Sequence, residues 1–474
     1  MSGRPFRPPR TFSVMAIALV LASALVGCTG SPVRSGKPSI VFILTDDQRW
    51  DTLDGMPTVR RELAAHGVTF ANAFVSDPLC CPSRASILTG QYAHSTGVWQ
   101  NKPPYGGFRA FNQDRSTIAT WLRRAGYRTA LFGKYLNQYK GTYVPPGWDK
   151  WEAIAGAVDP YDLYYRYTLN IDGNLMKHGN HPEDYSTNVL TNDAIDFIRH
   201  TPGSLFVYFA PYGPHTPARP APEDKDRIPN LRPLRPASFN EPDVADKPQW
   251  VRSLQPIAPA GVRKIDLLRR KTYATLLSVD RAVGKIVEAL AETGRLHNTL
   301  IVFMSDNGFL FGEHRFFNKA VPYEEAIRVP MVVRYDRLVR SPRVDRHLVV
   351  NIDVAPTFAA FARVQSPGVE GMSFLPLLSD PDPPWRSDFL VEHMNVLHVP
   401  SLCGVRSERF MYVHYATGEE ELYDLQVDPY ELQNVVRESK LADVVRRLQS
   451  REKQLCNPPP PVTTTGGGSE GTGD

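Results

Sequence analysis

The stretch Ser39-Ile-Val-Phe-Ile-Leu-Thr-Asp-Asp-Gln48 gives the clearest indication of the fold. Its first six residues form a short apolar run rich in β-branched side chains, which is typical of a strand buried in a parallel sheet. Asp46 and Asp47 follow at the carboxyl end of this strand. In open α/β sheets, functional groups gather at the carboxyl ends of the strands. The stretch therefore predicts an α/β fold with a functional site at that edge.

Three further strand-like runs end in polar side chains. Thr299-Leu-Ile-Val-Phe-Met304 precedes Ser305-Asp-Asn-Gly308, residues 128–132 precede Gly133 and Lys134, and residues 204–210 lead to His215. Carboxylates and an amide carbonyl are suitable ligands for one hard cation. Taken singly, each pattern has a simpler interpretation as a helix cap, a turn, a solvated lysine or a loop histidine.

A cysteine motif lies between the strand-like run at 39–44 and the one at 128–132. In Leu79-Cys-Cys-Pro-Ser-Arg-Ala-Ser-Ile-Leu-Thr-Gly90 the pattern Cys-x-Pro-Ser-Arg precedes Leu-Thr-Gly in one register only, with Cys80 first and Cys81 at the free position. A buried thiol or a vicinal disulfide is the alternative interpretation. The motif resembles the signature by which sulfatases mark a cysteine for oxidation to formylglycine.

The hydrated aldehyde of formylglycine offers one hydroxyl to attack sulfur and a second to expel sulfate. The attacking hydroxyl needs a base, or a metal with cations, to become nucleophilic.

The order of the motifs along the chain resembles that of the sulfatase family, within the alkaline phosphatase superfamily. The resemblance covers about residues 38 to 435. Gly133-Lys-Tyr-Leu-Asn-Gln-Tyr139 and Val144-Pro-Pro-Gly-Trp148 are closer still to glucosamine-6-sulfatases and extracellular heparan endosulfatases.

The resemblance implies a role for each motif residue. The expected Ca²⁺ ligands are Asp46, Asp47, Asp306, Asn307 and an oxygen of modified Cys80. Arg84 would hold the formylglycine oxygen. The residues expected to bind the sulfate oxygens and stabilise charge on the bridging oxygen are Lys134, His215 and Lys319.

One position departs from the pattern of many arylsulfatases, which carry Gly-Lys-x-His with the histidine as the base that eliminates sulfate. Leu136 stands at that position, as in the glucosamine-6-sulfatase group. His94 is the candidate replacement and His314 a weaker one, so the base stays open.

The N-terminus carries the pattern of an exported bacterial lipoprotein. Arginines precede an apolar stretch, 14–26, that is too short to span a bilayer, and Leu25-Val-Gly-Cys28 resembles a lipobox. We expect a signal peptide at 1–27, lipid on Cys28, a linker at 28–37 and a location on the outer face of the membrane. An ordinary cleaved signal peptide is the alternative.

Loss of the signal peptide removes three arginines and lowers the formal charge from +4 to about +1. Nucleic acid is therefore not an expected partner.

Once Cys28 is assigned to lipid and Cys80 to modification, Cys403 and Cys456 remain near the C-terminus. In an exported protein they are candidates for a disulfide, which the sequence does not establish.

The chain is 42% hydrophobic and 22% charged, as expected for a globular protein with a large core. We predict an α/β catalytic domain at 38–380, with a large mixed, mostly parallel sheet between helices, like that of alkaline phosphatase. The Pro-rich region 214–259 is expected to be an insertion over the strand ends, and 269–293 a helix. A small α+β subdomain on an antiparallel sheet is predicted at 386–456, and a disordered tail at 457–474.

The function expected from the resemblance is calcium-dependent hydrolysis of sulfate monoesters on a sulfated sugar, after a formylglycine-generating enzyme has modified Cys80. Two alternatives remain open. One is a phosphodiesterase or phosphonate monoester hydrolase of the same superfamily. The other is an inactive lipoprotein that only binds sulfated glycans.

Overall fold

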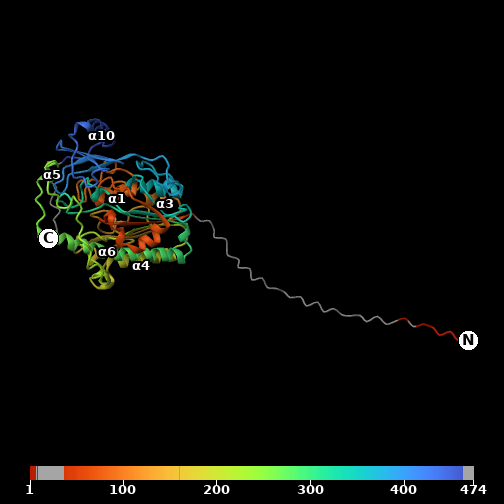
Figure 1. Cartoon of the computed structure of the whole chain (residues 1–474). Helices are drawn as coiled ribbons and strands as arrows, with labels where there is room; N and C mark the ends of the chain where they lie inside the picture. The colour runs from red at the N-terminus through yellow and green to blue at the C-terminus, as the bar shows by residue number, and fades with distance from the viewer. Residues whose placement is uncertain (7, 9–36, 160, 463–474) are drawn as a thin grey trace. The chain divides into compact units, whose positions relative to one another are not determined.

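The computed structural model describes residues 1–6, 8, 37–159 and 161–462. A ten-stranded sheet forms the centre of the part from residue 37 onward (Figure 1). Across the sheet the strands are β13 (Arg343–Asp345), β2 (Gly67–Phe70), β12 (Met331–Arg334), β9 (Thr299–Ser305), β1 (Ser39–Thr45), β8 (Leu205–Ala210), β4 (Arg128–Gly133), β5 (Lys150–Ala157), β6 (Tyr167–Ile171) and β7 (Asn174–Lys177). The five central strands, β9 to β5, are parallel, and β12, β6 and β7 pair antiparallel with their neighbours. The predicted mixed, mostly parallel sheet is confirmed.

Helices cover both faces of this sheet. Alternate side chains of β1 point to opposite sides, so Phe42 packs in one core and Val41 in the other. The first core includes α1 (Cys80–Thr89), α3 (Ile118–Arg124) and α8 (Val354–Ala362), and the second includes α4 (Ser186–His200) and α6 (Pro259–Glu292). Burial on both faces explains the uninterrupted apolar run of β1. Helix α6 begins ten residues before the predicted helix, with Pro259 in its first turn, where proline is tolerated.

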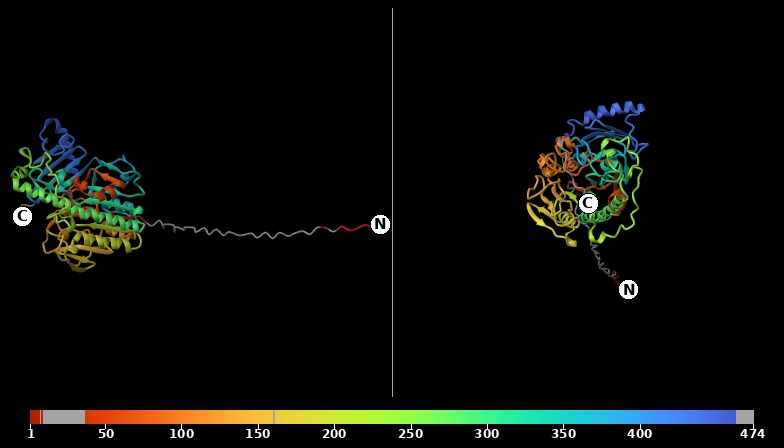
Figure 2. Two further views of the ribbon diagram at one scale, coloured as in Figure 1. Left: turned by 60° about the horizontal axis from the view of Figure 1, so that its bottom comes forward. Right: turned by 90° about the vertical axis from the view of Figure 1, so that its left-hand side faces the viewer.

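The C-terminal part forms a second, smaller sheet (blue in Figures 1 and 2). It is antiparallel and consists of β15 (Asp388–His393), β16 (Leu402–Ser407), β17 (Phe410–Tyr415) and β18 (Glu420–Asp424), with α10 (Ala442–Leu455) packed on it. Cys403 on β16 forms a disulfide with Cys456, directly after α10. The apolar runs 389–391, 410–415 and 421–425 predict three strands of this sheet, but the sequence does not predict β16.

Short elements occupy the connections. They are α2 (Ala93–Thr96), α5 (Gln249–Arg252), α7 (Glu324–Ile327), α9 (Leu375–Ser379) and the strand pairs β10 (Leu310–Phe311) with β11 (Phe317–Asn318) and β3 (Ala73–Phe74) with β14 (Val349–Val350). The Pro-rich region 214–259 crosses to the loop after β10, where Asn240 donates its backbone N–H to Gly312 O at 2.7 Å.

Several predicted features lie outside the described residues. They are Cys28, the signal peptide from residue 9 onward, nearly all of the linker, and residues 463–474 of the tail. The predicted domain limits at 380 and 386 stay predictions. None of the helices in the described part of the chain is long and apolar enough to cross a membrane.

Candidate active site

The two acidic clusters meet because β1 and β9 are parallel neighbours in register, with Thr45 opposite Ser305. The backbone N–H of Asp47 donates to Asp306 Oδ1 at 3.1 Å. The side-chain amide of Asn307 donates to Asp47 Oδ1 at 2.7 Å. Asp47 has a φ of 62°, in the left-handed region that non-glycine residues rarely adopt. These contacts hold that backbone in place and turn its carboxylate toward the neighbouring strand end.

Cys80 is the first residue of α1, and its motif fixes where the helix begins and ends. Asn351 accepts a hydrogen bond from Ser76 N at 3.1 Å and donates one to the motif serine, Ser83 Oγ, at 3.0 Å. Gly90, with a φ of 74°, ends the helix in the left-handed conformation that glycine favours. The motif therefore anchors both ends of the segment that carries Cys80.

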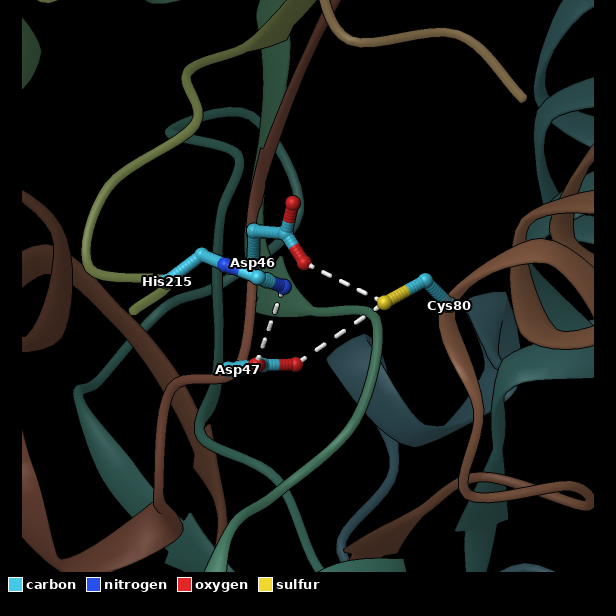
Figure 3. A group of neighbouring side chains, drawn as sticks. All are labelled: Asp46, Asp47, Cys80 and His215. Atoms are coloured by element: carbon cyan, nitrogen blue, oxygen red, sulfur yellow. Dashed lines mark hydrogen bonds and ion pairs between the residues drawn. The ribbon is translucent and has the colours of Figure 1, made fainter. Parts of the chain in front are cut away.

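The thiol of Cys80 faces the carboxylates of β1. Its Sγ lies 3.5 Å from Asp46 Oδ1 and 3.9 Å from Asp47 Oδ1 (Figure 3). Cys81 instead packs in the hydrophobic core, and both thiols are free, so the vicinal disulfide considered from the sequence is wrong. Burial raises the pKa of both thiols, to about 12 for Cys81.

Three buried cations surround the acidic groups. Lys134 Nζ lies 2.5 Å from Asp46 Oδ2, and Arg84 Nε donates to Asp306 Oδ2 at 2.7 Å. Lys319 Nζ bonds Asp47 Oδ1 and lies 2.8 Å from Cys80 Sγ.

These cations change the acidity of the carboxyl groups. Burial alone would raise the pKa of Asp46, but Lys134, His215 and Arg84 together hold it well below its usual range. Burial, with the charge of Asp46 second, raises the pKa of Asp306 to about 6 despite Arg84. Burial would lower the pKa of Lys319, and the charge of Asp47 outweighs it and raises that pKa.

His215 approaches from the loop after β8. Its Nε2 lies 3.5 Å from Asp47 Oδ2 (Figure 3). Its Nδ1 lies 2.6 Å from both Tyr212 OH and Thr216 O, and Tyr164 OH donates to its backbone carbonyl at 2.7 Å. Burial lowers the pKa of His215 against the opposing charges of Asp47 and Asp46. The sequence reasoning missed both tyrosines, although Tyr212 stands only three residues before the histidine.

The donor set fits a hard divalent cation. It consists of three carboxylates and the amide oxygen of Asn307, all buried. That oxygen, Oδ1, has no hydrogen-bond partner among the residues that the structure describes. Donor atoms of Asp46, Asp47, Cys80 and His215 also lie within 4.8 Å of one another. Oxygen ligands of this kind suit Ca²⁺ or Mg²⁺ better than a thiophilic metal.

The structure brings together the predicted residues Cys80, Arg84, Lys134, His215, Lys319, Asp46, Asp47, Asp306 and Asn307, but the other histidines differ. His94 Nδ1 lies 2.9 Å from Glu392 Oε2 and its Nε2 3.6 Å from Glu370 Oε1. His314 Nδ1 lies 2.7 Å from Glu241 Oε2. Within the described part of the chain, neither histidine hydrogen-bonds to or forms an ion pair with Cys80 or its carboxylate neighbours.

Leu136 is buried in the hydrophobic core. An aliphatic side chain cannot take up a proton, so position 136 supplies no base.

Similarity to known proteins agrees with this arrangement. The Sulfatase family model matches residues 38–364, and the model for the C-terminal region of N-sulphoglucosamine sulphohydrolase matches 312–457. Human N-acetylglucosamine-6-sulfatase is 36% identical over 400 residues, which cover 80% of this chain and 71% of the human protein. The extracellular sulfatase SULF-1 homolog of Drosophila melanogaster is 36% identical over 378 residues, 76% of this chain. The chain spans only 33% of that protein's length and 52% of a similar putative Caenorhabditis elegans protein.

Solved structures share the fold. BT4656, in complex with its substrate D-glucosamine-2-N,6-O-disulfate, superposes with a TM-score of 0.79 at 26% identity, over 88% of this chain and 97% of that one. A phosphonate monoester hydrolase of Agrobacterium radiobacter superposes with a TM-score of 0.71 at 21% identity, over 88% and 95% of the two chains, which shows the common fold alone. Since the Sulfatase model spans most of the chain and the human relative is matched over more than two thirds of its own length, this chain belongs to the sulfatase family.

Proposed function

We propose that the protein hydrolyses sulfate monoesters of a sulfated amino sugar, with formylglycine formed from Cys80 as the nucleophile and a calcium ion bound beside it. The observation that carries this proposal is the position of Cys80 Sγ, between Asp46, Asp47 and the ammonium of Lys319. The sugar substrate is inferred from the human N-acetylglucosamine-6-sulfatase and from the disulfated glucosamine named as the substrate of BT4656.

The ligands and the modified residue have distinct tasks in this proposal. Asp46, Asp47, Asp306 and Asn307 would hold the cation. Residue 80, once modified to formylglycine, would supply a nucleophilic oxygen and a route for releasing sulfate, and a calcium ion held by these ligands would stabilise the charge on that oxygen. Arg84 is suited to hold an oxygen of residue 80, because its Nη2 has no hydrogen-bond partner within the described residues.

The remaining groups bind the substrate. Lys134 and Lys319 place two buried ammonium groups where the sulfate oxygens would lie, and they favour the charge that grows as the S–O bond breaks. Thr216 O can only accept a hydrogen bond, so His215 Nδ1 carries a proton, and Nε2, which faces Asp47, presents one to the bridging oxygen when the ring is an imidazolium.

Mass analysis of the peptide that contains Cys80, from protein of the native host, tests the nucleophile. We expect an aldehyde at position 80, made by a formylglycine-generating enzyme, and an unmodified Cys81. A thiol at both positions in a preparation that binds sulfated glycans without turnover would favour the binding protein instead. Rates on aryl sulfates and aryl phosphonates separate a sulfatase from a phosphonate monoester hydrolase or phosphodiesterase.

We also propose that the protein is an exported bacterial lipoprotein, anchored by Cys28 to the outer face of the membrane. The support is the lipobox-like sequence Leu25-Val-Gly-Cys28 after an apolar stretch. Labelling cells with a fatty-acid analogue should mark the native protein but not Cys28→Ser. Label on that variant would refute the anchor.

A further inference from the structure

A second buried group of potential metal ligands lies apart from the Cys80 site. It consists of His314, in the loop between β10 and β11, Glu325 on α7, and Glu431, which follows β18. One donor atom from each lies within 4.8 Å of the others. The three side chains come from both the main domain and the C-terminal part of the chain, and their residues are 0%, 7% and 1% exposed.

Each residue of this group has an unused polar atom. Among all the residues that the structure describes, none provides a hydrogen-bond partner for His314 Nε2, Glu325 Oε2 or Glu431 Oε1. A buried polar atom without a partner costs about 1–3 kcal/mol, so three in one place call for a ligand or for shared protons. Other atoms of the same side chains are engaged, since Glu431 Oε2 accepts the backbone N–H of Glu324 at 2.9 Å.

The histidine is oriented as a metal ligand would be. His314 Nδ1 lies 2.7 Å from Glu241 Oε2, and an ionised carboxylate can only accept a hydrogen bond. Burial raises the pKa of Glu241 to about 7, so above that pH the carboxylate is ionised, the proton of the neutral imidazole is on Nδ1, and Nε2 carries a free lone pair. Metal-binding histidines commonly donate their second nitrogen to a carboxylate in this way. Lys247, whose Nζ lies 3.8 Å from Glu241 Oε1, keeps that carboxylate paired.

Among the residues that the structure describes, no cation forms an ion pair with the side chain of Glu325 or Glu431, although the charges of Arg49 and Arg406 act on them from farther away. Lys247 donates to Tyr423 OH at 3.0 Å and to the backbone carbonyl of Glu431, not to its carboxylate. The two carboxyl groups and the imidazole face one another in a buried space. Burial raises the pKa of Glu325 to about 8 and that of Glu431 well above its usual range, so these groups hold protons that a bound divalent cation would displace.

We propose that His314, Glu325 and Glu431 bind a divalent transition-metal ion of the zinc class. One imidazole nitrogen and two carboxylate oxygens suit zinc, whereas calcium takes oxygen ligands only. With metal–ligand distances of about 2.1 Å, tetrahedral ligand atoms lie about 3.4 Å apart. The three donor atoms lie within 4.8 Å of one another, so small side-chain movements would bring them to this spacing. The ion would join the C-terminal part of the chain to α7 and to the loop that leads to Lys319.

Metal analysis of the whole protein tests this site. Protein stripped with a chelator, reloaded with zinc and dialysed should retain about one equivalent. Glu431→Gln should retain less than a tenth of that amount, and Glu241→Gln, which keeps all three ligands, should bind zinc about 10–100 times more weakly. Glu421→Gln is the matched control: this carboxylate is equally buried, but Tyr323, Tyr415 and Tyr423 hydrogen-bond to it, so zinc retention should match the wild type.

Thermal unfolding supplies a second measurement that does not depend on catalysis. Zinc should raise the Tm of the wild type and of Glu421→Gln, and leave that of Glu431→Gln unchanged. If Glu431→Gln does not fold, the weaker binding of Glu241→Gln carries the test. A wild-type protein that retains no zinc and shows no shift, or equal zinc retention in wild type and Glu241→Gln, would overturn the proposal, and the two glutamates would then share protons instead.

Discussion

Replacing His215 by alanine tests which group protonates the leaving oxygen. The ring nitrogen Nε2 faces Asp47 Oδ2 at 3.5 Å, and Nδ1 is held by Tyr212 and Thr216, so the variant removes the group that, as an imidazolium, would donate a proton from Nε2. General acids typically contribute 10²–10⁴ in rate, and the lower limit corresponds to about 2.7 kcal/mol. We therefore expect kcat on a sugar sulfate to fall by about 10² or more.

The leaving group provides the internal comparison. Nitrophenolate scarcely needs a proton, so the loss on nitrophenyl sulfate should be much smaller than the loss on glucosamine 6-sulfate. Tyr212→Phe is the matched variant. It removes one of two contacts to Nδ1, worth about 0.5–1.5 kcal/mol, and should reduce kcat by about 2- to 12-fold. Equal losses of His215→Ala on both substrates would mean that His215 only binds sulfate and that another group is the acid.

Three further predictions follow from the same geometry. Cys80→Ala should abolish sulfate release while Cys81→Ala keeps most of it, because only Cys80 faces the carboxylates. An inactive Cys81→Ala variant would refute the assignment of Cys80 to the first position of the motif. Asp306→Asn should lower both calcium content and turnover in a folded protein, and full activity without bound calcium would refute the ligand set. Burial would lower the pKa of His94, but hydrogen bonds to Glu370 and Glu392 outweigh it and raise the pKa to about 10. His94 therefore stabilises the fold fully below about pH 6.5 and loses this effect as the pH rises toward 10, so His94→Gln should lower Tm more at pH 6 than at pH 10. An equal drop in Tm at pH 6 and pH 10 would show that His94→Gln loses packing contacts only.

The sequence predicted the strand ends because a buried strand and the polar residues after it are both local patterns. Asp46 and Asp306 follow such strands and do lie together. What the sequence could not state is that β1 and β9 are neighbours, since strand order depends on long-range pairing. The resemblance to a family supplied that information.

Some features were missed because the sequence carries no clear local pattern for them. Strand β16 was not predicted, because Gly404 and Arg406 interrupt its apolar pattern. Tyr212 carries no motif of its own, and its role appears only when its hydroxyl is placed 2.6 Å from His215 Nδ1. The same holds for Glu431, which meets His314 across more than a hundred residues of chain. His94 was considered for the active site, and its carboxylate partners could not be foreseen from the sequence.

Charge alone does not choose between a sulfate and a phosphonate ester in this site. The buried cations and carboxylates balance one another, being Arg84, Lys134 and Lys319 against Asp46, Asp47 and Asp306. A bound divalent cation makes the site positive and attracts any monoanion, and sulfate monoesters and phosphonate monoesters both carry a single negative charge. Selection must therefore come from hydrogen bonding.

A sulfate monoester offers three terminal oxygens to the ammonium groups of Lys134 and Lys319, whereas a phosphonate monoester replaces one of these oxygens by carbon, which accepts no hydrogen bond. One buried donor is then left unpaired, at a cost of about 1–3 kcal/mol, or about 5- to 150-fold in kcat/KM. We expect nitrophenyl sulfate to be preferred over a nitrophenyl phosphonate by at least the lower factor. Lys134→Met should reduce this preference, because it removes a donor that only the sulfate can satisfy. A preference for the phosphonate, or a ratio unchanged in Lys134→Met, would show that the two lysines do not recognise the third terminal oxygen.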